Sequence, residues 1–411
     1  MSPKFSVVYP TRHRPHFVRQ ALRVLELQPA SDFEVVVSDN FEDPALSCEQ
    51  ACRDTTLPSV RYVRPPRPVG MVENWNHALP HATGEYVCFL TDKTFLLPGA
   101  LDRIGRAIGQ AGRPDLVSWT SDAYNPARSE DLFGDGTYYN HSPEARGRGL
   151  FRRFSAGKEL DRRGRAEVSR KEQTPQEYTR GKLAFGAYRR ELIQRIVDRF
   201  GTLFHNINPD YTSMVLGLTE ARSAIEMRDS CVVSVNTDLS NGRITDENDR
   251  AMYEFLDGLD GGIGAILPDL LVPGVYASQH NGVAHDYLWL RRRFGLRFAW
   301  EPTAWLAYIH EDIHRPARRW SSPQVEAEQK GLLAAFLAAD PRVDAAVRAR
   351  LAAREEARHA PPKRPPAPIR VGRRWYLRFR PEVTPPERLP ASYGSLETAL
   401  ASRFGGAPAP A

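Results

Sequence analysis

Two arginines that follow the first strand-like run of the chain are placed to hold a phosphate. Residues 5–9 read FSVVY, and the next six residues read PTRHRP, with Arg12 and Arg14 two positions apart. A turn from a strand into a helix presents main-chain N–H groups and the positive end of the helix to an anion. Arginine adds a planar guanidinium that matches phosphate oxygens. The pattern indicates an anion site, with a loop of solvated arginines as the alternative.

A carboxylate directly follows the second strand-like run. Residues 34–38 read EVVVS, and Asp39 comes next. At the end of a strand its oxygens could accept hydrogen bonds from a base N–H or a ribose hydroxyl. An Asp-Asn pair such as Asp39-Asn40 also suits the cap of a turn. Both interpretations stay open at this point.

The elements that must position these residues alternate between strand and helix. Alternation of this kind predicts an α/β fold with a mostly parallel sheet flanked by helices. Such sheets bind ligands at the carboxyl ends of their strands. Strands are expected at 5–9, 34–38, 60–63, 86–90 and 231–235. Helices are expected at 17–25, 71–79, 98–108, 183–200, from 209 onward, at 246–259 and at 324–337.

Four ordered segments resemble the family 2 glycosyltransferases, which have the Rossmann-like GT-A fold. They are PTRHRP at 10–15, VVVSDN at 35–40, GMVENWNHALPHATGEYVCFL at 70–90 and FLTDKTFLLPGAL at 89–101. The resemblance is good over residues 5–108 and weaker over 208–240. It implies an inverting transfer of a sugar from a nucleoside diphosphate donor, of UDP or dTDP type, to an acceptor that the sequence does not identify.

The resemblance also implies which residues bind the donor. Pro10 and Thr11 would border the nucleotide, and Asp39 would bind the base. Asn74 or Asn76 would help to close the site, and Asp92 would meet the ribose or the diphosphate. With the arginines of the first turn and the residue after Asp92, the predicted donor site is Pro10, Thr11, Arg12, Arg14, Asp39, Asn74, Asn76, Asp92 and Lys93.

The expected metal motif departs from the family pattern. The family usually has an Asp-x-Asp-like motif whose last carboxylate binds Mg²⁺ or Mn²⁺, and here Lys93 stands in its place. An ammonium group repels a divalent ion, yet it can itself offset the charge of a diphosphate. We therefore assign no certain cofactor, with Asp92 as the ligand if a metal binds. Either Lys93 and the arginines replace the metal, or the chain is a catalytically impaired sugar-nucleotide-binding protein.

Asp210 is the candidate general base. An inverting transferase needs a group that takes the proton of the acceptor hydroxyl. The segment HNINPDY at 205–211 fits the family position of that base, in a loop that leads into a helix. The alternative is that Asp210 caps the helix.

Charge and composition set the domain organisation that we expect. Residues 1–240 form the GT-A domain, with a basic, exposed and mobile insertion at about 125–180, because 146–172 hold ten Lys or Arg against four Asp or Glu. Residues 241–355 form a mostly helical extension. Residues 356–411 form a Pro- and Arg-rich tail with weak order. Peripheral membrane contact through the basic segments stays open.

Whole-chain properties argue against several other classes. A net charge of +6 over 411 residues does not indicate nucleic-acid binding. Four sparse cysteines and the lack of a leader-like or ~20-residue apolar run predict a cytoplasmic protein. A nucleotidylyltransferase would need a Gly-rich phosphate loop near the first strand, and the sequence has none there.

Overall fold

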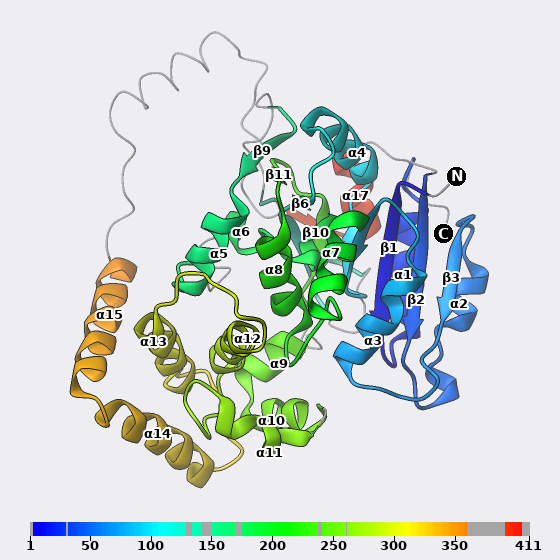
Figure 1. The fold of residues 1–411 in the computed structure, drawn as a ribbon. Helices are drawn as coiled ribbons and strands as arrows, with labels where there is room; N and C mark the ends of the chain where they lie inside the picture. Colours follow the sequence, from blue (N-terminus) through cyan, green and yellow to red (C-terminus); the bar gives the residue numbers. More distant parts are fainter. Residues whose placement is uncertain are drawn as a thin grey trace, which may run out of the picture.

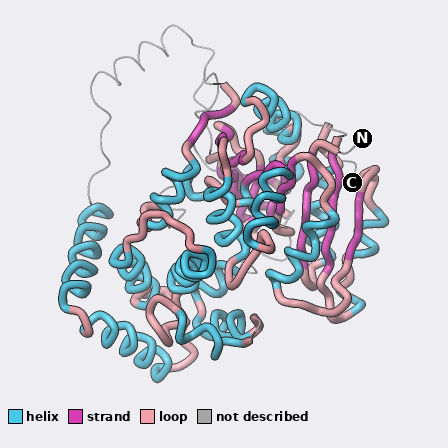
Figure 2. The backbone as a smooth tube through the Cα atoms, in the orientation of Figure 1, coloured by secondary structure: helices cyan, strands magenta, loops and turns pink. Residues whose placement is uncertain are grey.

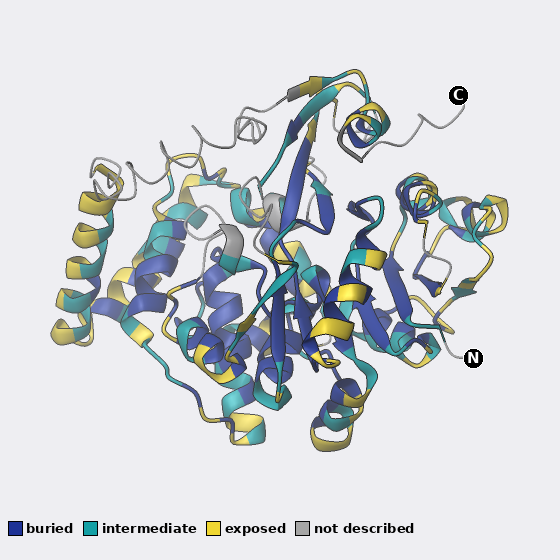
Figure 3. Cartoon of the chain, turned by 90° about the horizontal axis from the view of Figure 1, so that it is seen from above, coloured by how far each residue is buried: buried dark blue, intermediate teal, exposed yellow. Residues whose placement is uncertain are grey.

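A computed structural model describes residues 3–29, 32–128, 134–141, 149–168, 175–236, 241–259, 261–359 and 391–404. Strands gather on one side of the molecule and helices without strands on the other (Figures 1 and 2). Seen from above, the strands form the buried centre, and exposed residues lie mainly on the outer helices (Figure 3).

The larger sheet confirms the predicted fold class. Its strand order is β3-β2-β1-β4-β10-β6-β11-β9. Strands β1 to β4 run parallel, and β10 lies antiparallel between β4 and β6, so only β10 and β9 oppose the common direction. The bounds are β1 (Phe5–Thr11), β2 (Phe33–Asp39), β3 (Val60–Val63), β4 (Tyr86–Phe89), β6 (Leu116–Ser118), β9 (Phe151–Phe154), β10 (Gly186–Arg189) and β11 (Ala224–Met227).

Helices cover both faces of this sheet, which explains its continuous apolar strands. Every residue of β1 and β2 is buried, as expected of parallel strands that are covered on two sides. Val7 and Tyr9 of β1 pack in one core with α1, α2 and α4, whereas Val8 packs in another with α3, α7 and α8. The bounds are α1 (Pro15–Leu25), α2 (Glu49–Asp54), α3 (Met71–Ala78), α4 (Ala100–Ala111), α7 (Arg190–Phe200) and α8 (Pro209–Glu220).

A second sheet extends the first core. Its order is β13-β8-β7-β12-β5. Residues 391–404, which the sequence places in the tail, contribute β13 and helix α17 (Leu396–Phe404), and Leu396, Ala399 and Leu400 are buried in the first core. The rest of the predicted tail from 360 to 390 lies outside the described residues. The bounds are β5 (Thr94–Leu96), β7 (Ser121–Pro126), β8 (Gly136–Tyr139), β12 (Val232–Val235) and β13 (Ala391–Tyr393).

The described residues between 241 and 359 are mostly helical and lie beside the larger sheet (Figure 1). Helix α12 contacts both α8 and α13, which joins this region to the sheet. Among the described residues no helix combines the length and apolarity needed to span a bilayer. The helices are α9 (Asn241–Glu247), α10 (Asp249–Asp257), α11 (Gly262–Ile266), α12 (Gln279–Phe294), α13 (Pro302–Ile313), α14 (Pro323–Ala338) and α15 (Pro341–His359).

One predicted helix is wrong in its first part. Residues 183–200 are not one helix, because a 3₁₀ turn (Leu183–Phe185) and β10 precede α7. The apolar spacing of Phe185, Tyr188 and Leu192 fits a helix, but a short apolar run also fits a buried strand. Here Tyr188 pairs with β4 and β6 in the middle of the sheet.

The basic insertion is also more ordered than expected. Its described part contains β8, β9, α5 (Ala156–Gly164) and α6 (Pro175–Tyr178). Arg163 donates to Glu159 at 3.0 Å, and Arg180 donates to Glu159 at 3.0 Å and to Glu226 at 3.1 Å. All four side chains are buried, which charged groups tolerate when they are paired. The interpretation as a solvated loop is therefore wrong for these residues.

Candidate active site

Two adjoining cavities lie at the carboxyl ends of the parallel strands. The first, the strand-end cavity, has a volume of about 510 Å³ and is lined by residues 10–14, the start of α3 and the end of α10. The second, the aromatic cavity, has a volume of about 400 Å³, and its ring-bearing walls are Trp75, Tyr178, Tyr211, Phe255 and Tyr276. Phe185 is a further aromatic residue of the second cavity. Arg14, Met71, Trp75, Thr91, Asp92 and Phe255 line both cavities.

Asp92 stands at this junction and is held on both of its oxygens. The hydroxyl of Thr11 donates to Oδ2 at 3.2 Å, and the guanidinium of Arg14 donates to Oδ1 at 3.3 Å. Thr11 ends β1 and Arg14 precedes α1, so the strand-to-helix turn and the loop after β4 meet at one carboxylate. The structure thus brings Thr11, Arg14 and Asp92 together, as the sequence predicts.

The other predicted donor residues divide into two groups. Pro10, Arg12 and Asn74 line the strand-end cavity. Arg12 is exposed and pairs with Glu42. Asn76 lines neither described cavity, because its side chain bonds to the main chain of Phe204. It ties α3 to the loop before α8.

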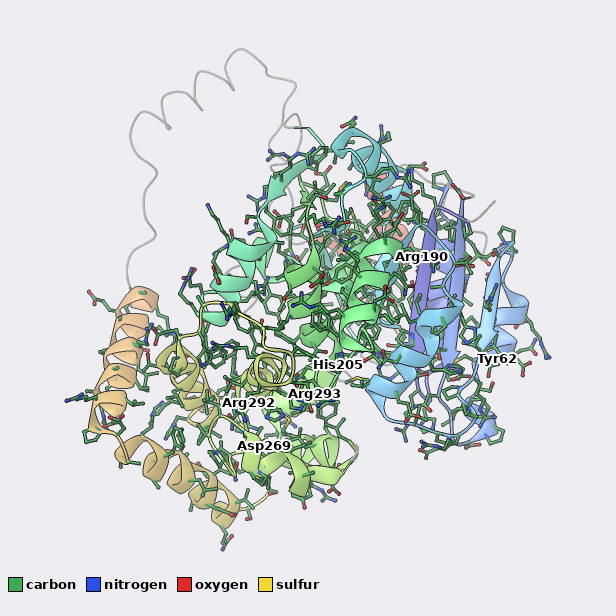
Figure 4. The ribbon with its side chains drawn as sticks, viewed as in Figure 1. Tyr62, Arg190, His205, Asp269, Arg292 and Arg293 are labelled. Atoms are coloured by element: carbon green, nitrogen blue, oxygen red, sulfur yellow. The ribbon has the colours of Figure 1, made fainter. Side chains whose placement is uncertain are left out.

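Asp39 reaches the predicted edge but points into the protein. Its Oδ2 accepts the N–H of Cys48, the residue before α2, at 2.6 Å and the hydroxyl of Tyr62 at 3.1 Å. Tyr62 lies on the outer strand β3 (Figure 4). Asp39 is fully buried and lines neither described cavity, whereas Asn40 lines the strand-end cavity. Oδ2 thus holds the start of α2, nine residues further along the chain, and not the turn that directly follows Asp39. Contact with a base stays a prediction.

Lys93 lies in the wall of the aromatic cavity next to the junction. It is buried. Burial, with a smaller contribution from the nearby Arg14 guanidinium, lowers the pKa of Lys93 to about 8, and Asp92 opposes the shift. Lys93 thus places a second cation, besides Arg14, in the wall of the aromatic cavity.

Asp210 also faces the aromatic cavity, from the first turn of α8. It is not the N-cap, because Asn208 holds that position and Pro209 opens the helix. Its carboxylate lies 3.4 Å from the ammonium of Lys182. Lys182 in turn lies between the rings of Tyr178 and Tyr211, at 4.0 and 3.7 Å from their centroids. The carboxylate of the candidate base is therefore paired with a buried ammonium group, which itself packs against two tyrosine rings.

Helix α12 fixes the loop that leads to Asp210. Asp286 accepts hydrogen bonds from the main-chain N–H of Ile207 at 3.2 Å and of Asn208 at 2.9 Å. His205, at the start of the same loop, packs on Trp289 and lies near Arg293 (Figure 4). The loop geometry before α8 is thus set by a residue that is distant in the sequence.

Replacement of Asp286 by Asn is expected to remove a pH dependence of stability. Burial raises the pKa of Asp286 to about 7, although its hydrogen bonds oppose the shift. A carboxyl group with a raised native pKa stabilises the fold most below the unfolded pKa and loses that contribution as the pH rises through about 7. The difference in the free energy of unfolding between wild type and Asp286→Asn should therefore fall by up to about 1.4 kcal/mol per pH unit between pH ~5 and ~7.

Urea unfolding of both proteins across this pH range measures the effect. The Asn variant keeps the shape of the side chain but has no titrating proton. Parallel pH curves for the two proteins would contradict the prediction.

The sequence does not indicate Lys182, Tyr178, Phe255 or Asp286 as site residues. Tyr178 belongs to the predicted basic insertion at about 125–180, and Lys182 lies between that insertion and the next predicted helix. Phe255 and Asp286 come from helices after residue 240, and no motif connects them with the first hundred residues. A single charged or aromatic residue in a helix does not indicate a site in the sequence, because its partners in space come from distant segments.

Comparison with known proteins agrees with the resemblance seen in the sequence. The model of Glycosyl transferase family 2 matches residues 6–154. A curated relative, the GalNAc(5)-diNAcBac-PP-undecaprenol beta-1,3-glucosyltransferase of Campylobacter jejuni, is 33% identical over 103 residues, which are 25% of this chain and 33% of that protein. The chain thus matches about a third of the length of this relative.

Solved structures with a similar course of the chain have low identity. TarS 1–349 of S. aureus in complex with UDP-GlcNAc is 16% identical, covers 84% of each chain and has a TM-score of 0.45. The mannosyltransferase PcManGT of Pyrobaculum calidifontis, in complex with GDP-Man and Mn²⁺, is 16% identical with a TM-score of 0.38 and the same coverage. The N-terminal segment of the chain, residues 6–154, is thus similar to glycosyl transferase family 2.

Proposed function

We propose that the chain is an inverting glycosyltransferase that moves a hexosyl group from a nucleoside diphosphate sugar to an acceptor hydroxyl. The observation that carries the proposal is the pair of cavities that meet at Arg14 and Asp92, with Asp210 in the wall of the second cavity. The family match and the curated glucosyltransferase relative support the same reaction class.

The two cavities suit the two halves of the reaction. The strand-end cavity, beside the turn of residues 10–14, would take the nucleoside of a UDP- or dTDP-type donor. Its volume lies in the usual range of small-molecule sites. The cationic junction would meet the diphosphate. The aromatic cavity would hold the donor sugar and the acceptor, because aromatic rings offer flat apolar faces to sugar C–H groups.

Asp210 would act as the general base. The acceptor oxygen attacks the anomeric carbon from the face opposite to the diphosphate, while Asp210 takes the hydroxyl proton. The bond from the anomeric carbon to the phosphate oxygen breaks, and the nucleoside diphosphate leaves with that electron pair, so the configuration inverts. A positioned base of this kind contributes typically ~10²- to 10⁴-fold to the rate.

Lys182→Met is expected to reduce kcat about tenfold and leave donor binding unchanged. The substitution removes the ammonium that lies 3.4 Å from Asp210 but keeps an apolar side chain between the two tyrosine rings. A carboxylate that loses its partner cation is less well positioned to take the acceptor proton. Lys182→Arg should restore part of the rate.

Separate measurement of kcat and of the KM for the donor distinguishes this role from a purely structural one. In Lys182→Met kcat should fall while the KM for the donor stays unchanged, and a melting curve should show that the variant is folded. An unchanged kcat in the folded variant would contradict a positioning role.

A second candidate is a sugar-nucleotide-binding protein with impaired catalysis. It is favoured by Lys93, a cation in the position where the family usually has a metal-binding carboxylate. A thermal-shift screen of nucleoside diphosphate sugars, with and without Mn²⁺, identifies the donor, since ligands that bind the native state raise the melting temperature. Slow release of nucleoside diphosphate from the donor then separates the enzyme from the binding protein.

A further inference from the structure

We propose that Arg14 and Lys93 bind the diphosphate of the donor in place of a divalent metal, with Asp92 as the residue that positions Arg14. The inference rests on the proposed function, because it concerns how the same donor would be held. Asp92 would then not bind a metal but would position the cationic clamp that Arg14 and Lys93 form. The clamp would take any nucleoside diphosphate whose base fits the strand-end cavity.

The side chains at the junction do not suit a divalent ion. Mg²⁺ and related ions need several oxygen ligands, commonly from carboxylates and water. The two oxygens of Asp92 accept hydrogen bonds from Thr11 and Arg14, and the next residue along the chain is a buried lysine. Among the described residues there is no group of three or more His, Cys, Asp or Glu side chains that could hold a metal. The donor set therefore disagrees with the metal motif of the family.

The same side chains suit a diphosphate. Lys93 and Arg14 together carry two positive charges, as one divalent ion would. Both side chains line the aromatic cavity, and Arg14 also lines the strand-end cavity. A group that extends from the strand-end cavity therefore passes Arg14 and enters the cavity that Lys93 lines. Charge-assisted hydrogen bonds from lysine and arginine to phosphate oxygens are strong. In a partly buried site they are also weakly screened by salt.

Asp92 has a clear role in this arrangement. It holds the Arg14 guanidinium at 3.3 Å and the end of β1 through Thr11 at 3.2 Å. An arginine that is fixed before the ligand arrives loses less side-chain entropy on binding. The negative charge of Asp92 also keeps two cations close together in the free protein, where they would otherwise repel each other.

Calorimetric binding of UDP, dTDP, GDP, ADP and CDP to the full chain tests the proposal. Each titration is done in excess EDTA and again in excess Mn²⁺. We expect at least one of these nucleotides to bind in EDTA, with an affinity that Mn²⁺ changes by less than about threefold, or about 0.6 kcal/mol. Lys93→Met should weaken that binding about 10- to 100-fold, the effect of losing one hydrogen bond to a charged group.

Three further variants make the result specific. Lys93→Arg should restore much of the affinity, and Lys93→Asp should lose binding in EDTA and recover part of it in Mn²⁺. Lys330→Met, on α14 and paired with Glu326, is the control and should bind as wild type does. Melting curves of all variants show that they are folded.

The outcomes separate this inference from the proposed function. Binding that requires Mn²⁺, or wild-type affinity in Lys93→Met, overturns the clamp and leaves the glycosyltransferase assignment standing. If none of the five nucleotides binds in either buffer, both the clamp and the proposed donor class are wrong.

Discussion

Asp210→Asn is expected to lower glycosyl transfer by about 10²- to 10⁴-fold and to leave nucleoside diphosphate binding within about twofold of wild type. The amide has almost the shape of the carboxylate but cannot take the proton of the acceptor hydroxyl. Asp210 lies in the wall of the aromatic cavity and not in that of the strand-end cavity, so the nucleoside contacts should persist. Transfer rate and nucleotide affinity are measured separately on the same preparation.

Asp198→Asn is the matched control for this variant. Asp198 lies on the exposed side of α7 and accepts a hydrogen bond from Gln194. Its replacement changes the net charge by the same amount at a distance from the cavities. Because Asp210→Asn leaves the Lys182 cation without its carboxylate partner, a melting curve is needed to show that the fold is kept. Wild-type transfer in a folded Asp210→Asn protein would sink the assignment of the base.

Gly164→Ala is expected to lower the free energy of unfolding by about 1–3 kcal/mol or more. A Cβ atom at this position would lie 1.9 Å from the carbonyl oxygen of Ala299 and 2.8 Å from the ring of Phe298. The carbonyl belongs to the main chain and cannot move alone. The carbonyl of Gly164 itself accepts a hydrogen bond from the indole N–H of Trp305 at 2.9 Å. This bond also fixes the distance between Gly164 and the helices after residue 240.

The contact between Gly164 and Ala299 also joins the helices after residue 240 to the part of the molecule that holds the sheet. Both parts supply walls of the aromatic cavity, so Gly164→Ala should reduce transfer as well as stability. Gly157→Ala, in the same helix α5, is the control, because nothing lies within 4 Å of its Cβ position. It should be neutral or slightly stabilising, since alanine is the better helix former. Equal stability of the two variants by urea unfolding would show that the contact with Ala299 is relaxed at little cost.

Much of the sheet was predictable from the sequence because its strands obey a simple physical rule. Strands β1 and β2 are covered on both faces, so they appear as unbroken apolar runs, and polar residues mark their ends. That rule also located Thr11 and Asp92 at one edge. It did not show that the Asp39 side chain turns inward to Cys48 and Tyr62, since side-chain direction depends on the loop that follows.

Helices that are buried on most sides were not predictable in the same way. Helix α13 buries every residue from Ala304 to Ile309, so its buried residues surround the helix axis and do not form one stripe. A periodic pattern needs a solvent-facing side, which α12 and α13 largely lack. Asp286, which α12 contributes to the loop before Asp210, was missed for this reason.

Charged residues were the other source of error. Composition predicts that Arg163 and Arg180 are exposed, but each is buried against a carboxylate. Lys182, just after the predicted insertion, is buried between aromatic rings. Glu226 lies 46 positions beyond its partner Arg180, and Asp210 lies 28 positions beyond its partner Lys182. Hydropathy measures single residues, whereas burial of a charge is a property of a pair.

The return of residues 391–404 to the second sheet has a consequence for synthesis on the ribosome. Strand β13 pairs with β8 and is the outer neighbour of that strand. About 250 residues separate them, so at about 5–20 residues per second the edge of β8 waits roughly 10–50 s for its partner. An unpaired strand edge is a template for pairing with other chains. The nascent protein therefore exposes this edge, and the apolar surface that α17 covers, until nearly all of the chain described here has been made.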